Sequence, residues 1–152
     1  MIVRPIRVTD LPAVLSLLEG SCRELNNLST DPERLAHRVR WAQRAFANQV
    51  ERADADYLFV MEDDEQQVIG VCGLSGAIGL REPCYNYRVG TTHGSAPVLG
   101  IEKHIPTLFL CNEMTGQSLL CSLFLRRDHR QGYTGRLLST ARLLFVAEFP
   151  RL

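Results

Sequence analysis

Several features that mark specialised classes of protein are scarce or absent in this sequence. Its 17 lysines and arginines balance 17 aspartates and glutamates, so the formal net charge is zero. A zero net charge argues against a nucleic-acid coat or a polybasic membrane anchor as the main purpose of the chain. No segment approaches the roughly 20 apolar residues of a membrane helix, and the start lacks the apolar run of a secretory signal. We therefore expect a cytoplasmic protein whose partners are neither nucleic acids nor membranes.

The cysteines and histidines form no recognisable disulfide or metal motif. The five cysteines are odd in number and include no C-x-x-C pair, which suits reduced thiols better than a disulfide or zinc framework. His93, His104 and His129 lie in polar stretches without the spacing of metal ligands. Cys121 lies in an apolar stretch with no basic partner nearby, where a core role is more common than that of an acyl-carrying nucleophile. We expect no metal site.

What the chain does contain is the composition of an ordinary globular domain. Of its 152 residues, 45% are hydrophobic and 22% are charged, which is enough to bury one sizeable core. No internal repeat or low-complexity tract divides it. We predict one folded domain over residues 1–152.

The first third of the chain predicts an edge strand followed by two helices. Residues 2–8 alternate between apolar and polar around a proline, and residues 11–18 have the apolar spacing of a short amphipathic helix. Thr30 and Glu33 have the capping-box spacing at the start of the second helix. The arginines of this helix are expected mostly to face water; they are Arg34, Arg38, Arg40 and Arg44.

The middle of the chain predicts extended structure. Residues 57–61 and 68–78 read as a hairpin, and its acidic turn at residues 62–65 is more often solvated than metal-binding. Residues 85–89 and 108–111 add two further extended stretches.

The last third predicts a strand, a loop and a helix. Residues 119–125 are almost continuously apolar, which is typical of a strand covered on both faces. From Gly135 onward the apolar residues recur at helical spacing. The order of elements therefore predicts an α/β fold, a mixed sheet with helices packed on it.

The loop between that strand and helix is the most informative segment for function. It contains glycines, which let a backbone approach an anion, and it opens into a helix whose first amides favour negative charge. Four arginines add positive charge for a phosphorylated ligand: Arg126, Arg127, Arg130 and Arg136. An ordinary strand–loop–helix corner is the alternative interpretation, because short glycine motifs recur often. The sequence has neither a P-loop motif nor the G-x-G-x-x-G dinucleotide fingerprint.

This arrangement resembles the pyrophosphate loop of the GCN5-related N-acyltransferases, which bind acyl-CoA. Arg130 and Gly135 match the Arg-x-x-Gly-x-Gly pattern of that loop, whereas Tyr133 stands at its middle glycine and Gly132 lies one place earlier. The amino-terminal strand, followed by Asp-Leu-Pro and a helix, also resembles the opening of that fold. We also expect a side chain at Gly135 to crowd a bound phosphate and to require an unfavourable backbone conformation.

Further motifs resemble the arginine N-succinyltransferases of bacterial arginine catabolism over essentially the whole chain. They are YNYRVG (85–90), IPTLFL (105–110), Asn112 with Thr115-Gly116, SLFL (122–125), LLS (137–139) and ARLLFVAEF (141–149). The resemblance, closest to beta-type chains, implies succinyl transfer from succinyl-CoA, as co-substrate and not as a permanently bound cofactor, to the α-amino group of arginine or ornithine. It also implies a homo-oligomer or pairing with a related alpha-type chain. Because family members continue further, the chain resembles an amino-terminal module whose fold is incomplete at the carboxyl end. We therefore expect an arginine N-succinyltransferase of which residues 1–152 alone have little or no activity.

The resemblance also suggests which residues meet the substrates. The expected acyl-CoA contacts are Leu123, Leu125, Arg130, Gln131, Gly132, Tyr133, Thr134, Gly135 and Arg136. The expected substrate contacts are Asn86, Tyr87, Arg88, Asn112 and Thr115, since a guanidinium suits a carboxylate. Glu113 is the candidate base for the amine proton, although a glutamate in a turn is more often solvated.

Two departures from the family pattern keep alternatives open. Glu113-Met114 replaces the usual Asp-His or Asp-Leu, and Leu119 stands where a glutamate is common. The alternatives are an acetyltransferase of the same fold acting on another amine, and a CoA-binding or regulatory subunit without turnover.

Overall fold

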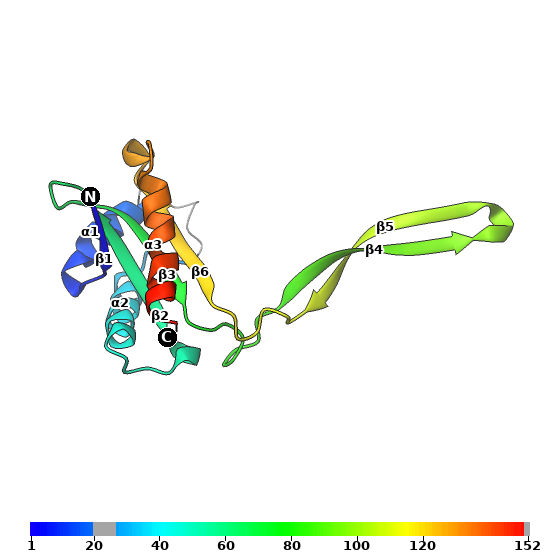
Figure 1. The fold of residues 1–152 in the computed structure, drawn as a ribbon, viewed down its shortest axis with the longest axis horizontal. Helices are drawn as coiled ribbons and strands as arrows, with labels where there is room; N and C mark the ends of the chain where they lie inside the picture. Colours follow the sequence, from blue (N-terminus) through cyan, green and yellow to red (C-terminus); the bar gives the residue numbers. More distant parts are fainter. Residues whose placement is uncertain (20–26, 151–152) are drawn as a thin grey trace.

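The body of the protein is a four-stranded sheet with helices on both faces (Figure 1). This computed structural model describes residues 1–19 and 27–150. The strands lie in the order β1-β2-β3-β6, and their bounds are β1 (Ile2–Pro5), β2 (Asp56–Glu62), β3 (Val68–Ser75) and β6 (Leu119–Leu125). Every pairing in the described part of this sheet is antiparallel, and the predicted α/β fold, a sheet with helices packed on it, is confirmed.

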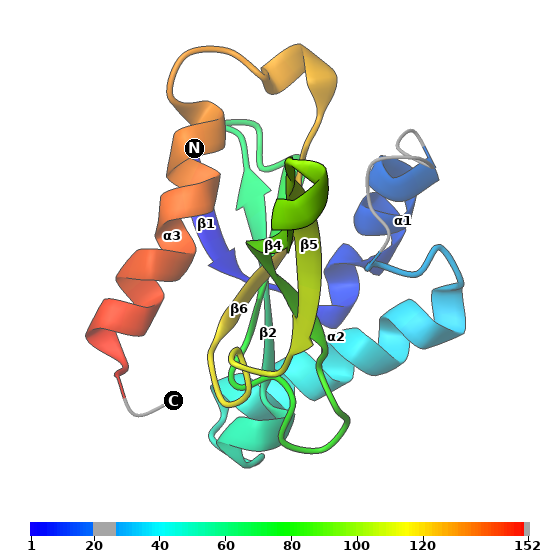
Figure 2. The same ribbon diagram turned by 90° about the vertical axis from the view of Figure 1, so that its right-hand side faces the viewer.

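Within residues 1–19 and 27–150, three α-helices cover the sheet, and their bounds are α1 (Leu11–Glu19), α2 (Pro32–Phe46) and α3 (Thr134–Glu148). Figure 2 shows α1 and α2 on one side of the sheet and α3 on the other. Strand β2 explains this division, because its side chains alternate between the two faces. Leu58 and Val60 pack with α1 and α2, whereas Tyr57, Phe59 and Met61 pack on the side of α3. The protein therefore has one core layer on each side of the sheet.

Local chemistry sets the start of α2 differently from the predicted capping box. The side chain of Asp31, and not of Thr30, accepts hydrogen bonds from the amides of Glu33 and Arg34. Pro32 occupies the first turn, where its missing N–H removes no helical hydrogen bond. Arg38 is also an exception to the expectation that the arginines of α2 face water, because its side chain is only 22% exposed.

The hairpin of β2 and β3 is confirmed. In its acidic turn Asp64 and Glu65 are exposed, whereas the side chains of Glu62 and Asp63 are only 16% and 15% exposed. The carboxylate of Asp63 accepts hydrogen bonds from the amides of Glu65 and Gln67 and thereby shapes the turn. Among residues 1–19 and 27–150, no group of three or more histidine, cysteine, aspartate or glutamate side chains could hold a metal ion. In the same part of the chain, no helix is long and apolar enough to cross a membrane.

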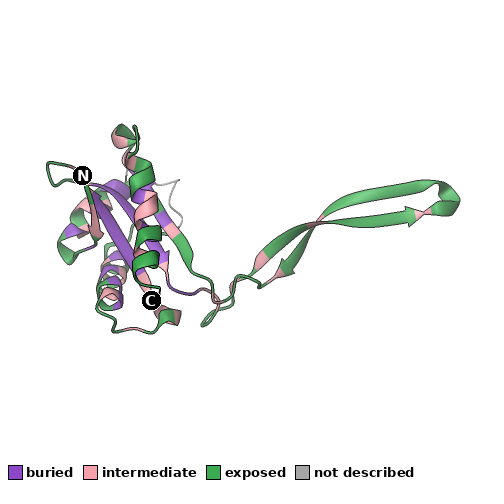
Figure 3. Cartoon of the chain, viewed as in Figure 1, coloured by how far each residue is buried: buried purple, intermediate pink, exposed green. Residues whose placement is uncertain are grey.

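Strands β4 (Asn86–Ala96) and β5 (Ile101–Cys111) form a long two-stranded ribbon that projects from the body (Figure 1). The sequence predicted only the base of this ribbon, at residues 85–89 and 108–111, and did not separate it from the main sheet. Figure 3 shows it as almost wholly exposed. We call it the arm. Four short 3-10 turns complete the described structure: Val8–Asp10, Arg52–Asp54, Pro97–Leu99 and Arg127–His129.

Strand β6 is the edge of the sheet next to β3, and it is not covered on both faces as its composition suggested. Phe124 and Leu125 are buried, but Leu119, Leu120 and Leu123 are 44%, 41% and 46% exposed. No strand of the described residues pairs with its outer edge. An apolar strand thus borders an open side of the sheet.

Candidate active site

A cavity of about 440 Å³ lies where the end of β6 meets the start of α3. Its lining residues are Leu123, Phe124, Leu125, Arg130, Gln131, Gly132, Gly135, Arg136 and Leu138. The structure therefore brings together seven of the nine residues expected to contact acyl-CoA. Tyr133 and Thr134 are not among the lining residues: Tyr133 is 79% exposed, and Thr134 begins α3.

The start of α3 presents amide groups toward an anion. The first i−4 hydrogen bond of the helix runs from the Leu137 amide to the Tyr133 carbonyl, at 2.8 Å. The amides of Gly135 and Arg136 precede that bond, so the helix itself offers them no acceptor. No side chain caps this end of the helix. The helix start combines available donors with the positive end of the helix dipole.

Two arginines supply positive charge at this cavity. The Nε of Arg130 donates to the Leu125 carbonyl at 2.8 Å, and its guanidinium lies 5.3 Å from the centre of the Phe124 ring. These contacts hold the Arg130 side chain against the end of β6. Arg136 is exposed in the first turn of α3. A phosphorylated ligand would meet one cation held against β6 and one exposed cation here.

The two glycines of the loop have different roles from those expected. Gly135 lies within α3 and is not in the left-handed region, so its expected backbone requirement is wrong. A Cβ built there would meet only Leu125 Cδ2, at 3.8 Å. Gly132 has φ 55°, which side-chain-bearing residues rarely adopt. Gly132 therefore shapes the loop, and Gly135 keeps the helix start open.

Strand β6 contains a β-bulge halfway along its length. Val71 pairs with Phe124, and Gly73 pairs with Cys121. An advance of two residues along β3 is therefore matched by three residues along β6, which means that β6 contains one extra residue. Ser122 has φ 53°, which places its backbone in the left-handed region. The Nη2 of Arg38 lies 3.3 Å from Ser122 Oγ and 3.9 Å from Cys121 Sγ. Cys121 thus has a cationic neighbour in space that the local sequence did not reveal.

The residues expected to contact the substrate gather at the base of the arm, at the other end of β6 from the loop (Figure 1). Asn86, Tyr87 and Arg88 begin β4, and Asn112 and Thr115 belong to the turn after β5. The Asn86 amide nitrogen lies 3.2 Å from Cys111 Sγ. Its Oδ1 is buried without a hydrogen-bond partner among the described residues. Tyr87 is 59% exposed, so it does not pack in a core.

Glu113, the candidate base, lies in the turn that follows β5. Its Oε1 is 3.5 Å from Arg88 Nη1, and both side chains are exposed. The turn is attached to the body by hydrogen bonds from the Gly116 amide to the Ile78 carbonyl and from the Ile78 amide to the Gln117 carbonyl. Glu113 and Arg88 are therefore brought together, but at an exposed edge and not in an enclosed pocket.

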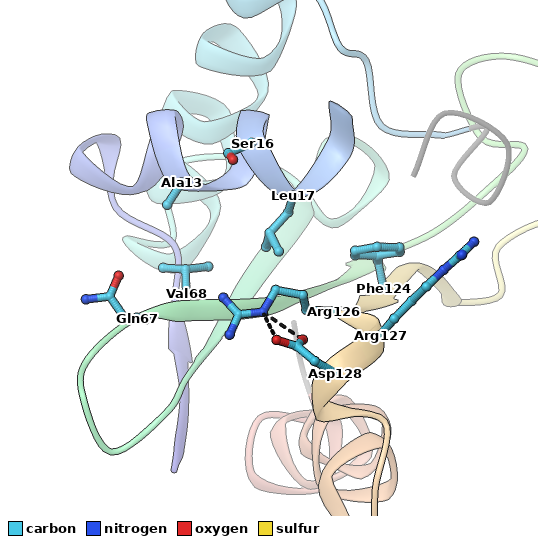
Figure 4. A pocket seen from close by; sticks show the side chains of 9 residues that line it. All are labelled: Ala13, Ser16, Leu17, Gln67, Val68, Phe124, Arg126, Arg127 and Asp128. Atoms are coloured by element: carbon cyan, nitrogen blue, oxygen red, sulfur yellow. Dashed lines mark hydrogen bonds and ion pairs between the residues drawn. The ribbon is translucent and has the colours of Figure 1, made fainter. Parts of the chain in front are cut away.

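A second cavity, of about 510 Å³, lies on the α1 side of the same loop (Figure 4). Phe124 lines it as well as the first cavity, and Arg126, Arg127 and Asp128 lie along its edge. Hydrogen bonds from His129 and then Arg126 lower the pKa of Asp128 to about 2. The basic loop thus retains one carboxylate charge at neutral pH. That carboxylate holds Arg126, with Nε–Oδ1 at 2.8 Å.

Comparisons with known proteins agree with one another. A family model described as "Arginine N-succinyltransferase beta subunit" matches residues 1–152. The arginine N-succinyltransferase subunit beta of Pseudomonas aeruginosa is 55% identical over 100% of this chain and 45% of its own length. The arginine N-succinyltransferase of Yersinia pestis (strain Pestoides F) is 40% identical over 98% of this chain and 43% of its own length.

The same relationship is visible in three dimensions. The solved structure of arginine/ornithine succinyltransferase subunit AI from Pseudomonas aeruginosa matches with a TM-score of 0.86 and 34% sequence identity. The match covers 97% of this chain and 46% of that chain. The chain thus spans somewhat less than half the length of these relatives.

Proposed function

Because this chain belongs to the arginine N-succinyltransferase beta-subunit family, we propose that it takes part in succinyl transfer from succinyl-CoA to the α-amino group of arginine or ornithine. The observation that carries the proposal is the cavity between β6 and α3. Seven residues of the expected acyl-CoA set line it, at an uncapped helix start with two arginines. Those donors suit the phosphates of CoA.

The proposed placement of the two substrates follows from the length of β6. The phosphates of CoA bind at residues 130–136. The extended pantetheine chain of CoA follows the exposed edge of β6 toward the arm formed by β4 and β5. Seven residues of strand span about 20 Å. The thioester then approaches the base of the arm, where Arg88 takes the α-carboxylate of the amino acid.

The proposed chemistry is nucleophilic acyl transfer. The neutral α-amine attacks the thioester carbonyl, the C–S bond breaks, and the thiolate leaves and takes up a proton. Glu113, acting through water, accepts the proton that the new amide nitrogen loses. Arg88 places a positive charge beside the Glu113 carboxylate, with Arg88 Nη1 3.5 Å from Glu113 Oε1. Backbone amides of β6 stabilise the oxyanion.

The proposed partner is another chain of the same family, bound through the arm. One face of the arm carries Tyr87, Val89, Leu108 and Leu110, which are 59%, 76%, 62% and 59% exposed. Val89 is directly opposite Leu108, and Tyr87 is opposite Leu110, so the four side chains form one apolar surface. A two-stranded ribbon is marginally stable alone, which favours its burial against a further chain.

Release of free thiol tests the proposed activity. Arginine, ornithine and agmatine, which lacks the carboxylate, are compared with succinyl-CoA and acetyl-CoA as donors. In a chain extended to the length of its relatives, we expect turnover with the two amino acids and succinyl-CoA, little with agmatine, and a lower kcat in Glu113→Gln. Residues 1–152 alone should show little or no turnover. CoA binding without turnover of any amine would instead support a regulatory subunit.

A further inference from the structure

Two arginines from opposite faces of the sheet hold the β-bulge of β6. Arg38 reaches it from α2, and Arg142 reaches it from α3. The Nη1 of Arg142 donates to the Cys121 carbonyl at 3.1 Å and to the Gly73 carbonyl at 3.4 Å. These two residues are directly opposite each other on β6 and β3, where the regular ladder is interrupted.

The bulge places two successive side chains on one face, and Arg38 contacts both of them. A Cβ built on Gly73 would meet Cys121 Sγ at 2.9 Å, Ser122 Cβ at 3.2 Å and Leu58 Cδ2 at 3.2 Å. Because Leu58 belongs to the core beneath α1 and α2, Cys121 and Ser122 both face that side. Asp56 holds Arg38 in place, with Nε–Oδ2 at 2.6 Å. Arg38 therefore binds the side chains of the bulge, and Arg142 binds its carbonyls.

The burial of Arg142 is energetically costly in a way that packing alone does not explain. The residue is 3% exposed, and its remaining hydrogen bonds go to the carbonyl and hydroxyl of Ser139. No carboxylate in the described part of the chain pairs with it. A buried charge without a counter-charge is usually less stable than an apolar side chain of similar size. Arg142 thus has a role that an apolar residue would not fulfil.

Helix α3 links the bulge to the phosphate-binding loop. The helix begins at Thr134 beside the first cavity, and Arg142 follows eight residues later, about 12 Å along the axis. Leu138, between them, lines the same cavity and is fully buried. One rigid helix therefore fixes the loop at one end of the cavity and the bulge of β6 at the other.

We propose that Arg38 and Arg142 are positioning residues that hold the bulge of β6 at the distance from the phosphate-binding loop that the thioester of acyl-CoA requires. The inference rests on the proposed acyl-CoA site. Arg142 acts through the Cys121 carbonyl, so it contacts β6 and not the phosphates. Loss of either arginine releases the bulge without changing the loop.

The test compares two ligands by calorimetry: succinyl-CoA, and 3′-phosphoadenosine 5′-diphosphate, which has the phosphates of CoA but no pantetheine arm. In Arg142→Met we expect succinyl-CoA to bind about tenfold more weakly, because a charge-assisted hydrogen bond is lost, while the nucleotide binds as in the parent. Arg142→Lys should recover part of the loss. Arg40→Met, an exposed arginine of α2, is the matched control and should change neither affinity.

Ser122→Gly keeps the test decisive if Arg142→Met does not fold. This variant removes the hydroxyl that Arg38 contacts, and glycine tolerates the backbone φ of 53°. Ser122→Gly should lower the affinity for succinyl-CoA and leave the affinity for 3′-phosphoadenosine 5′-diphosphate unchanged. Equal losses for both ligands, or no loss for either, would overturn the positioning role. A parent protein that binds neither ligand would overturn the acyl-CoA site itself, which is a separate result.

Discussion

Arg4 and Asp10 form a two-pronged ion pair at the edge of the sheet, with Nη1–Oδ2 at 2.8 Å and Nη2–Oδ1 at 2.9 Å. The side chains are only 12% and 7% exposed. Arg4 also pairs with Glu62 on β2, and the Arg7 amide donates to Asp10 at 2.7 Å. The pair thus connects β1, the turn before α1 and β2.

This ion pair predicts a dependence of stability on pH. Burial acts to raise the pKa of Asp10, but the hydrogen bonds from Arg4 and from the Arg7 amide outweigh it and lower the pKa below 3.8. A lowered pKa stabilises the folded state above that value, and the contribution is lost as the pH falls through the folded-state pKa. Asp10→Asn should lower the free energy of unfolding by roughly 3 kcal/mol at pH 7 and by clearly less at pH 3. Urea unfolding at the two pH values measures both differences. Glu82→Gln, at an exposed site, is the control. An equal cost at both pH values would contradict this linkage.

Substitution of the two loop glycines should separate stability from binding. Gly132→Ala places a side chain at φ 55° and should lower the free energy of unfolding by about 1–2 kcal/mol. Gly135→Val has space for its Cβ, with Leu125 at 3.8 Å, but its branches enter the cavity beside the helix start. Gly135→Val should therefore cause a large loss of CoA affinity and only a small decrease in the melting temperature of the free protein. Thermal unfolding with and without millimolar CoA measures both effects. Undiminished CoA affinity in Gly135→Val would show that the phosphates bind elsewhere.

Cys72 should resist alkylation while the protein is folded. Burial against α3 raises the pKa of its thiol to about 12, and the reactive thiolate is then scarce at pH 8. Cys84, Cys111 and Cys121 are partly exposed and should react first. Peptide mapping by mass spectrometry after brief iodoacetamide treatment distinguishes these four sites; Cys22 lies outside the described residues. Early labelling of Cys72 would mean that α3 separates readily from the sheet.

Charged residues on the apolar face of the arm should abolish association. Val89→Lys with Leu108→Glu places opposite charges directly across the ribbon, so the strand pairing is kept while the apolar surface is lost. Thr92→Lys with Ile105→Glu makes the same change on the opposite face and is the matched control. Sedimentation velocity should show a complex in the parent and the control, and a monomer in the first variant. A monomeric parent, alone and when mixed with an alpha-type chain, would rule out the arm as a docking surface.

The parts of the site that the sequence predicted are those encoded by local pattern. The apolar run at residues 119–125, the basic glycine loop and the helix after it form one continuous segment, and nine of its residues line one cavity. The hairpin of β2 and β3 was predictable for the same reason, since alternation of side chains needs only neighbours in the sequence. Local pattern did not reveal that the left-handed glycine is Gly132 and not Gly135, because both spacings fit a loop.

Contacts between distant segments decided the rest. Arg142 follows Leu138 at the spacing of the apolar helix face. The carbonyls of Cys121 and Gly73, 21 and 69 residues away, show why an arginine is buried there. Arg38 resembles its exposed neighbours on α2 until the bulge of β6 provides a partner 84 residues away. The arm depends on the pairing of residues 86–96 with 101–111, and nothing local prevents those strands from joining the main sheet. The sequence by itself determined the helices, the hairpin of β2 and β3 and the basic glycine loop, because neighbouring residues specify them. Tertiary structure alone decided which arginines are buried and where the arm lies, because burial and strand pairing depend on groups far apart in the chain.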